Sequence, residues 1–370
     1  MIITMKKLKF YRTRTSLPKG TKLIDTINSA SRELFFITHP NISKADPQAP
    51  LQLKKFLSRN SIDSLWAYYP WLSTAVRVPQ EDIYYQLRTA RNRNLITEDE
   101  QHLYRNTVVG VAGLSVGSAV ISSLVATGGS KNIKIADPDI IEITNLNRMQ
   151  ASLLDIGKNK AEITARRIWG IDPYANIEIW NKGLHKDGLK KFFFQKPKLD
   201  IFVDEMDDIA MKFAVRFSSR DARIPVVMAT DNGDSVIVDV ERFDLEPKRP
   251  IFHGRVRLSE SQLQNMSRTK FVELSTKIID PTYFTTRQQQ SILAIGKEVS
   301  GIAQLGSAAS IAGAAIAYVV RQIANKQKMP SGRYVIGCEQ TFIEGYNSAT
   351  KKKARERATL AFLKALKERR

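Results

Sequence analysis

The residues best suited to chemistry begin at Gly113-Leu-Ser-Val-Gly-Ser118, a turn of small residues between two apolar runs. Small side chains at such a turn let backbone amides and a helix N-terminus approach a phosphate or a ribose. The turn is a weakened G-x-G-x-x-G, because serines replace its second and third glycines. Without further signals it is equally typical of a strand–helix connection that binds nothing. The candidate nucleotide-binding residues here are Gly113, Ser115, Gly117 and Ser118.

Acidic and amide side chains follow the next apolar run. Asp137 stands 19 residues after Ser118, close to the spacing at which a carboxylate meets ribose hydroxyls in nucleotide-binding folds. The polar stretch continues through Asp139 and Asn145 to Arg148. We expect these side chains to line one cleft.

Two cations and a further carboxylate suit a bound triphosphate. Arg148 and Lys160 can neutralise phosphate charge, and Asp207 can hold Mg²⁺. A carboxylate that attacks the α-phosphorus of ATP needs positioning and charge neutralisation rather than a protein nucleophile. Each residue alone has a structural explanation: Asp137 can end a strand, Lys160 can be solvated, and Asp207 can cap the next helix. The ordered set favours nucleotide chemistry.

Alternating strands and helices must position these residues. The pattern predicts strands at 107–112, 132–136, 177–180, 199–203 and 224–230, with helices at 113–127, 157–169 and 209–220 between them. Such alternation requires a mostly parallel sheet with helices on both faces. Flanking elements are a strand at 34–38, a buried aromatic cluster at 65–72, a small-residue helix at 301–320, a strand at 333–338 and a basic C-terminal helix with Leu360, Leu363 and Leu366 on one face.

The composition narrows the class of protein. Hydrophobic residues make up 43% and charged residues 25% of the 370 residues, which is typical of a soluble globular protein. The single cysteine, Cys338, excludes an internal disulfide framework and a cysteine-based zinc site. His102, His185 and His253 have no metal-ligand spacing, although His253 could border a substrate site. A reducing compartment, the cytoplasm, fits best.

The charge is concentrated at the two ends of the chain. Of the net +20, residues 1–23 and 351–370 each carry +7, so the region between them is only mildly basic. Basic ends can contact nucleic acid, or they can serve solubility alone. Residues 301–320 are long enough to span a membrane, but Ala, Gly and Ser supply little transfer energy. We therefore expect a packed helix there and no membrane partner.

The segment from Asp137 to Gln150 resembles the D-x-D…S-N-L-x-R-Q signature of ThiF/MoeB/HesA-type adenylyltransferases, relatives of ubiquitin-activating enzymes, with Met149 inserted after Arg148. Other family motifs follow in order. Asp155-Ile-Gly-Lys-Asn-Lys160 resembles the helix start that carries the phosphate-binding lysine, which places Lys160 in that role. Asp204-Glu-Met-Asp-Asp208 resembles D-x-x-D-N, which places Asp207 at the magnesium-binding carboxylate.

The resemblance carries expectations about fold, cofactors and assembly. It implies a Rossmann-like, doubly wound α/β fold that uses ATP and Mg²⁺ to adenylate a carboxylate on a peptide, a protein or a small molecule. Asn92-Arg93-Asn94 resembles N-R-Q, whose arginine reaches the neighbouring subunit's ATP, so we expect a homodimer in which Arg93 acts across the interface. The domains would be an accessory region at 1–83, the adenylation domain at 84–345 and the basic helix at 346–370.

Departures from the family pattern limit the chemistry. Members that transfer a carrier to sulfur use a cysteine after the Asp207 position, and many add C-x-x-C zinc sites; neither is present. Cys338 lies too late in the chain, and we expect it to be a buried apolar residue. A thioester step is therefore not expected. Two alternatives stay open: an enzyme acting on transfer RNA, like the threonylcarbamoyl-adenosine dehydratases, or a non-catalytic protein that binds NAD, FAD or a protein partner.

Overall fold

The computed structural model describes residues 7–256 and 268–368, so the first six residues of the basic N-terminal end lie outside the described residues. Two compact units are present. The first contains residues 1–102 and 169–174, and the second contains residues 103–168 and 175–370. The functional boundaries at 83 and 345 stay a prediction.

The first unit is built on a four-stranded sheet in the order β1-β3-β4-β2, with β2 and β4 parallel and the other pairs antiparallel. Its strands are β1 (Lys9–Tyr11), β2 (Lys22–Asp25), β3 (Ser64–Tyr69) and β4 (Thr74–Pro79). Its helices are α1 (Ile27–Thr38), α2 (Ala49–Arg59), α3 (Glu81–Thr89) and the start of α4 (Glu98–Asn106). Trp66 and Tyr69 are buried, as predicted for the aromatic cluster, whereas Tyr68 and Trp71 are only partly buried.

The predicted strand at 34–38 is wrong, because these residues form the end of α1. The run Leu-Phe-Phe-Ile-Thr has strand propensity, but its neighbours set a helical period. Ala30, Ser31, Leu34 and Phe35 are all buried, and this spacing places them on one helix face. Packing of that face therefore outweighs the local preference of the aromatic and β-branched residues.

The second unit is a seven-stranded sheet in the order β11-β10-β9-β8-β5-β6-β7. The five strands from β9 to β7 are parallel, and β10 and β11 run antiparallel at one side. The strands are β5 (Val109–Ala112), β6 (Asn132–Ala136), β7 (Asn176–Trp180), β8 (Ile201–Asp204), β9 (Val226–Asn232), β10 (Ser235–Glu241) and β11 (Gly332–Gly337). This is the predicted doubly wound, mostly parallel α/β fold.

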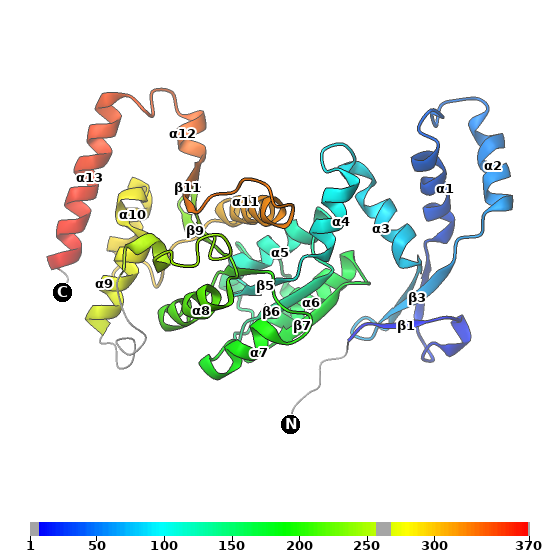
Figure 1. Ribbon diagram of the computed structural model, residues 1–370, viewed down its shortest axis with the longest axis horizontal. Helices are drawn as coiled ribbons and strands as arrows, with labels where there is room; N and C mark the ends of the chain where they lie inside the picture. Colours follow the sequence, from blue (N-terminus) through cyan, green and yellow to red (C-terminus); the bar gives the residue numbers. More distant parts are fainter. Residues whose placement is uncertain (1–6, 257–267, 369–370) are drawn as a thin grey trace. The chain divides into compact units, whose positions relative to one another are not determined.

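Helices cover both faces of this sheet (Figure 1). The helices of this unit are α5 (Val116–Ala126), α6 (Lys160–Ile171), α7 (Leu189–Phe194), α8 (Ile209–Ala222), α9 (Arg268–Ile279), α10 (Thr286–Ala294), α11 (Gly306–Ala324), α12 (Cys338–Phe342) and α13 (Ala349–Glu368), of which α9, α10, α12 and α13 lie beside the sheet. Right-handed crossovers put α5 and α6 on one face, because β5, β6 and β7 succeed one another in one direction. The connection through α8 runs the other way, from β8 to β9, so α8 covers the opposite face.

The small residues of α11 serve close packing within the chain. A side-chain carbon added at Gly313 would lie 2.6 Å from the carbonyl oxygen of Ala119 on α5, so only glycine fits there. Ala308, Ala309 and Ala312 are fully buried on the same helix. Among the described residues α11 alone is long and apolar enough to cross a membrane, and half of its most apolar window is buried in the protein. Buried core helices share those properties.

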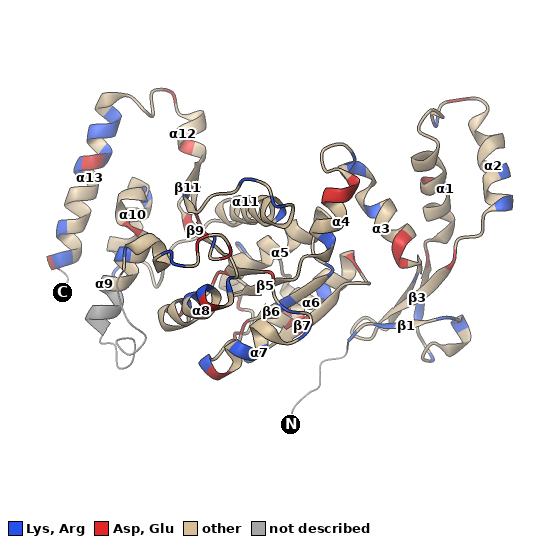
Figure 2. Ribbon diagram, in the orientation of Figure 1, with Lys and Arg blue, Asp and Glu red and all other residues tan. Residues whose placement is uncertain are grey.

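The basic C-terminal helix, α13, packs against α10 (Figure 1). Lys and Arg are distributed along α13 (Figure 2). Its buried residue is Phe362, whose ring lies 6.3 Å from that of Phe284. The basic C-terminal helix is as predicted, although Leu360 on its leucine face is 68% exposed.

Candidate functional site

The small-residue turn lies between β5 and α5, and its backbone demands glycine at the first position. Gly113 has a φ of +84°, and a side-chain carbon there would lie 2.2 Å from the carbonyl oxygen of Glu205. At Gly117 the same atom would lie 3.1 Å from Val111 on β5. These contacts bring α5 and the segment after β8 close to the end of β5. The turn is thus shaped by backbone packing, with the N-terminus of α5 directed at the sheet's carboxyl edge.

The two serines of the turn have different surroundings. Ser115 precedes α5, and its side chain makes no capping hydrogen bond there. Ser118 is buried, and its hydroxyl donates to the carbonyl of Ser115 at 2.8 Å and accepts from the backbone N–H of Gln150 at 3.1 Å. Ser118 therefore fixes the loop after β6 onto α5.

Asp137 follows β6 and joins two loops. Its two carboxylate oxygens accept the backbone N–H of Leu114 at 2.6 Å and of Asp139 at 2.9 Å. Burial raises the pKa of Asp137, and these two hydrogen bonds oppose that rise. The carboxylate thus holds the glycine turn beside the loop that carries Asp139. The contact of Asp137 with a ribose stays a prediction; the ribose hydroxyls would donate to the remaining lone pairs of this carboxylate.

Lys160 begins α6 at the same edge of the sheet. Its ammonium group lies 2.9 Å from the carboxylate of Asp139, and its backbone N–H donates to the Asp139 carbonyl at 2.9 Å. The lysine side chain is 8% exposed and the aspartate side chain 64% exposed. The buried ammonium group of Lys160 is therefore paired with an exposed carboxylate, and an anionic ligand can compete with Asp139 for Lys160.

The loop after β6 also orders Asn145 and Arg148. The side-chain oxygen of Asn145 accepts the backbone N–H of Glu142 at 3.1 Å, within a reciprocal capping box. Nη1 of Arg148 donates to the carbonyl of Thr144 and the side-chain oxygen of Asn147, at 3.0 and 2.9 Å. Asn145 is thus a loop-stabilising residue here, and its predicted nucleotide contact is untested.

Three aspartates lie at the end of β8 or directly after it, and two of them have structural partners. Asp208 caps α8 by accepting the backbone N–H of Met211 at 3.1 Å. Asp204 is fully buried between Lys212 and Arg216, at 3.2 and 2.5 Å. Asp207 is exposed and makes no hydrogen bond or ion pair with any residue that the structure describes. The helix cap proposed as the alternative role for Asp207 therefore belongs to its neighbour.

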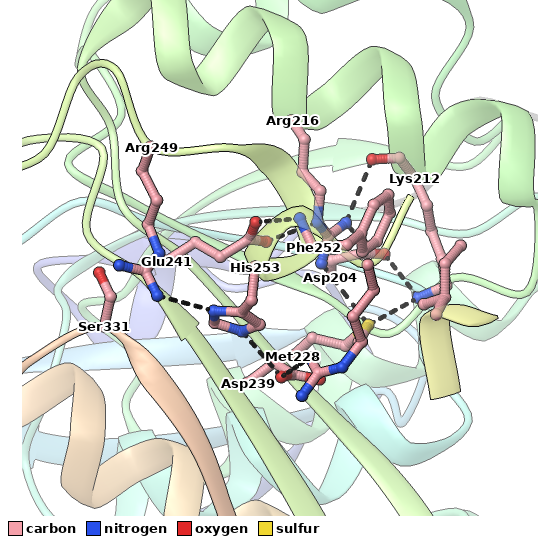
Figure 3. A network of polar contacts seen from close by, with 12 residues as sticks. Asp204, Lys212, Arg216, Met228, Asp239, Glu241, Arg249, Phe252, His253 and Ser331 are labelled. Atoms are coloured by element: carbon pink, nitrogen blue, oxygen red, sulfur yellow. Dashed lines mark hydrogen bonds and ion pairs between the residues drawn. The ribbon is translucent and has the colours of Figure 1, made fainter. Parts of the chain in front are cut away.

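Asp204 belongs to a buried network that extends to β10 and β11 (Figure 3). Arg216 also pairs with Glu241 at 2.6 Å and lies 4.0 Å from the centre of the Phe252 ring. Burial alone would raise the pKa of Asp204, but Lys212 and Arg216 outweigh it and hold that pKa below its usual value.

The same network accounts for His253. Its Nε2 lies 2.9 Å from Asp239, and its Nδ1 lies 3.0 Å from Nη2 of Arg249. Because Arg249 can only donate, Nδ1 accepts and Nε2 carries the proton. The suggested place of His253 at a substrate site is therefore not supported, since its ring is committed to these two partners.

Sequence reasoning missed a further carboxylate, Asp231, near the end of β9. Its side chain is 9% exposed; one oxygen accepts from Nε2 of Gln304 at 3.3 Å, and the other has no partner among the described residues. Burial raises its pKa to about 6, although Arg148 and Gln304 lower it. The only signal in the sequence was an acidic residue that follows a buried parallel strand.

Arg93 and Cys338 lie away from these groups in the chain. Arg93 is exposed, on a turn between α3 and α4 in the first unit, so its predicted cross-subunit role is untested. Cys338 begins α12 and is partly exposed, so the prediction of a buried cysteine is wrong. Among the described residues, no group of three or more His, Cys, Asp and Glu side chains is placed to hold a metal ion.

Parallel strands bring the candidate groups together. Ala112, Ala136 and Asp204 pair in register on neighbouring strands, so the residues that follow them share the carboxyl edge of the sheet. In doubly wound folds this edge is where ligands bind. A model of the ThiF family matches residues 89–358 of this sequence. The chain belongs to the ThiF family.

Individual relatives agree with this ThiF-family assignment. An uncharacterised protein of Mycobacterium tuberculosis, MT1398, is 36% identical over 269 residues, 72% of this chain and 37% of its own length. A probable molybdopterin-synthase adenylyltransferase of Porphyra purpurea is 31% identical over 119 residues, 32% of this chain and 30% of its own length. The chain thus matches about a third of these relatives' length.

A solved structure agrees in fold. Escherichia coli MccB, crystallised with MccA-N7isoASN, has a TM-score of 0.50 and 16% identity to this ThiF-family chain, and the match covers 90% of this chain and 92% of that one. At this identity the likeness shows the fold alone.

Proposed function

We propose that this protein is an ATP-dependent adenylyltransferase that activates a carboxylate as an acyl-adenylate, without a thioester step. The observation that carries the proposal is the arrangement at the carboxyl edge of the sheet. There the glycine turn, the buried Lys160 and the uncommitted Asp207 follow three strands of one parallel sheet. A non-catalytic dinucleotide-binding protein does not need a magnesium-binding aspartate at this point.

The reaction places a modest demand on the protein. A carboxylate oxygen of the substrate attacks the α-phosphorus of ATP, and the bond to pyrophosphate breaks. The N-terminus of α5 and the cations of Lys160 and Arg148 would stabilise the phosphate charge. Release of Lys160 from Asp139 would accompany phosphate binding.

Asp207 fits a magnesium ion, since one exposed carboxylate together with phosphate oxygens is a common set of Mg²⁺ ligands. When bound, the ion would neutralise charge on the phosphates. The residues that follow, Asp208 and Ile209, position Asp207 by starting α8 directly after it.

The test is an ATP–pyrophosphate exchange assay across a panel of peptides and small carboxylic acids. Exchange with at least one of them is expected, and Asp207→Ala and Arg148→Ala should each reduce it by about 100-fold or more. Asp221→Ala, an exposed aspartate on α8, is the matched control and should exchange as the wild type does. If both site variants exchange at the wild-type rate, these residues do not have the proposed roles.

We also propose a homodimer in which Arg93 completes the partner's site. The support is the exposed position of Arg93 on a turn and the family resemblance of Asn92-Arg93-Asn94. Mixing Arg93→Ala with Asp207→Ala should then restore part of the exchange activity, because one site of each mixed dimer has both groups intact. A monomer by light scattering that is active at nanomolar concentration would contradict this assembly.

Sulfur chemistry has no place in this proposal. Cys338 begins α12 and follows β11, the antiparallel strand at the side of the sheet. Cys338→Ser should therefore keep full exchange activity, and a reducible adduct on Cys338 would contradict that expectation.

A further inference from the structure

Asp231 lies on β9, beyond the carboxyl ends of the neighbouring strands that carry the proposed nucleotide site. On β9, Val227 pairs with Val203 of β8, and Asp231 follows four residues later. At about 3.3 Å per residue, the strand therefore carries Asp231 about 13 Å past that pair, outward from the carboxyl edge. A ligand that extends outward from the carboxyl edge in the direction of β9 would pass this position.

Asp231 is held by a hydrogen-bonded frame, and Arg148 is close enough to lower its pKa. The side chain of Asn147 donates to the carbonyl of Gln304 at 2.8 Å, while the side chain of Gln304 donates to Asp231 at 3.3 Å. A side-chain carbon at Gly306 would lie 2.2 Å from the carbonyl oxygen of Asn147, so the loop after β6 is tightly packed on the start of α11. Three segments far apart in the sequence thus meet around one carboxylate.

Two buried polar atoms in this frame lack partners among the described residues. One is an oxygen of Asp231, a side chain that is more than nine-tenths buried, and the other is Nε of Arg148. The carboxylate oxygen requires a donor, whereas Nε–H requires an acceptor. A buried polar atom without a partner costs free energy, so both atoms favour a ligand that supplies the missing group.

A secondary amide supplies both groups in one planar unit, with C=O and N–H pointing in opposite directions. A simple carboxylic acid has no donor for Asp231 once it is ionised, and an ammonium group has no acceptor for Arg148. We propose that Arg148, Asp231 and Gln304 form a subsite for the secondary amide next to the activated carboxyl group. The substrate is then a peptide or an N-acyl amino acid.

This inference rests on the proposed function, because the position of the amide follows from the nucleotide site. Arg148 is also the expected phosphate contact, so a group bound beside it lies within about one residue of the attacked phosphorus. At neutral pH Asp231 is ionised, since its pKa of about 6 lies below that pH, and its unmet oxygen is a strong acceptor.

Three stable analogues test the subsite by titration calorimetry. 5′-O-sulfamoyladenosine alone measures the nucleotide site. Its N-acetylglycyl derivative mimics a peptidyl adenylate, and its 4-oxopentanoyl derivative replaces the amide N–H by CH₂ and is otherwise matched. The N-acetylglycyl derivative should bind the wild type at least about 10-fold more tightly than the 4-oxopentanoyl derivative, the scale of one hydrogen bond to a charged group.

Variants of Asp231 test whether this residue causes the preference for the N-acetylglycyl derivative. In Asp231→Leu the preference should fall below about 3-fold, and in Asp231→Asn, which keeps an acceptor oxygen, it should be intermediate. Asp234→Asn, in the turn that follows β9, is the matched control and should keep the full preference. Sulfamoyladenosine itself should bind wild type and variants within about 3-fold of one another, the range expected if the nucleotide site is intact.

Each outcome decides one point. Equal binding of the two acyl derivatives to the wild type, with sulfamoyladenosine bound, overturns the amide subsite and leaves the proposed function standing. A preference that survives in Asp231→Leu overturns the role of Asp231. If sulfamoyladenosine does not bind the wild type, the proposed function fails and the subsite fails with it. The comparison of the two derivatives on the wild type needs no variant to fold.

Discussion

Two regions of the same sheet contain buried carboxylates, and they differ in whether those carboxylates are paired with cations. Around Arg216, Asp204 and Glu241 flank the guanidinium (Figure 3), and Asp239 lies 2.6 Å from Arg333. Eight residues before Asp239, Asp231 is buried with one oxygen unpartnered among the described residues. The first region stabilises the fold, whereas the second costs free energy that binding can recover. Unmet polar groups of that kind are typical of functional sites.

The largest expected effect follows from breaking the paired region. Arg216→Ala would leave Asp204 and Glu241 buried without their shared cation, and loss of one member of a buried ion pair costs about 3–5 kcal/mol. Urea unfolding at pH 7 measures the loss. Arg220→Ala, one turn along α8 and partly exposed, is the control and should change the unfolding free energy by about 0.5 kcal/mol or less. A similar change in both variants would mean that the network contributes little.

Asp231→Asn should change the free energy of unfolding in the opposite direction and stabilise the protein. Because burial raises the pKa of Asp231 to about 6, the folded state holds this proton more tightly than the unfolded chain, whose pKa is about 3.8. Its contribution to stability is therefore complete below about pH 4 and lost as pH rises through 6. Removing the charge should stabilise the protein at pH 8 by up to about 3 kcal/mol and have little effect at pH 4.

Urea unfolding of the wild type and of Asp231→Asn at both pH values measures this difference. Asp234→Asn in the adjoining turn is the control. A variant that is less stable than the wild type at pH 8 would show that Asp231 is paired in the folded protein. That result would also remove the reason to place a ligand beside it.

The contribution of Asp239 to stability should depend on pH in the reverse way. Burial would raise its pKa, but hydrogen bonds from His253 and Arg333 outweigh burial and lower it to about 2. Its stabilisation is thus present above the unfolded pKa of about 3.8 and lost as pH falls toward 2. Asp239→Asn should cost about 2 kcal/mol at pH 7, and the difference from the wild type should shrink below pH 4. A cost that does not vary with pH would show that packing, and not charge, is lost.

The sequence predicted the parallel strands and their carboxyl edge well, but it did not predict the buried ion pairs around Arg216, and both outcomes have physical reasons. Strand–helix alternation and the Gly113 turn are local features, so β5 to β9 could be predicted to within a few residues. Arg216 and Glu241 carry no local signal, because their pairing depends on how α8 packs against β10.

The same reasoning explains why Asp231 was missed and why one element was predicted wrongly. Asp231 becomes notable only when Gln304 and Arg148, far away in the sequence, are placed beside it. The strand predicted at 34–38 failed because tertiary packing selected a helix for those residues. Domain boundaries and the role of Arg93 depend on assembly, about which a single chain's pattern says little.

The smallest effects separate two neighbouring aspartates after β8. Asp208 caps α8, and loss of an N-cap costs about 1 kcal/mol, so Asp208→Ala should be destabilised by about that much. Asp207 is exposed and makes no contact among the described residues, so Asp207→Ala should change the unfolding free energy by about 0.5 kcal/mol or less.

Stabilisation by ATP and Mg²⁺ should be affected more by Asp207→Ala than by Asp208→Ala, the reverse of their effects on the stability of the protein alone. ATP with Mg²⁺ stabilises a protein that binds it by RT ln(1 + [L]/Kd), about 2.7 kcal/mol at 100 times Kd. Asp208→Ala should keep that increment, whereas Asp207→Ala should lose most of it if its carboxylate holds the ion. NAD should stabilise neither variant nor the wild type. Equal stabilisation of all three proteins by ATP and Mg²⁺ would show that the exposed carboxylate of Asp207 does not hold the metal ion.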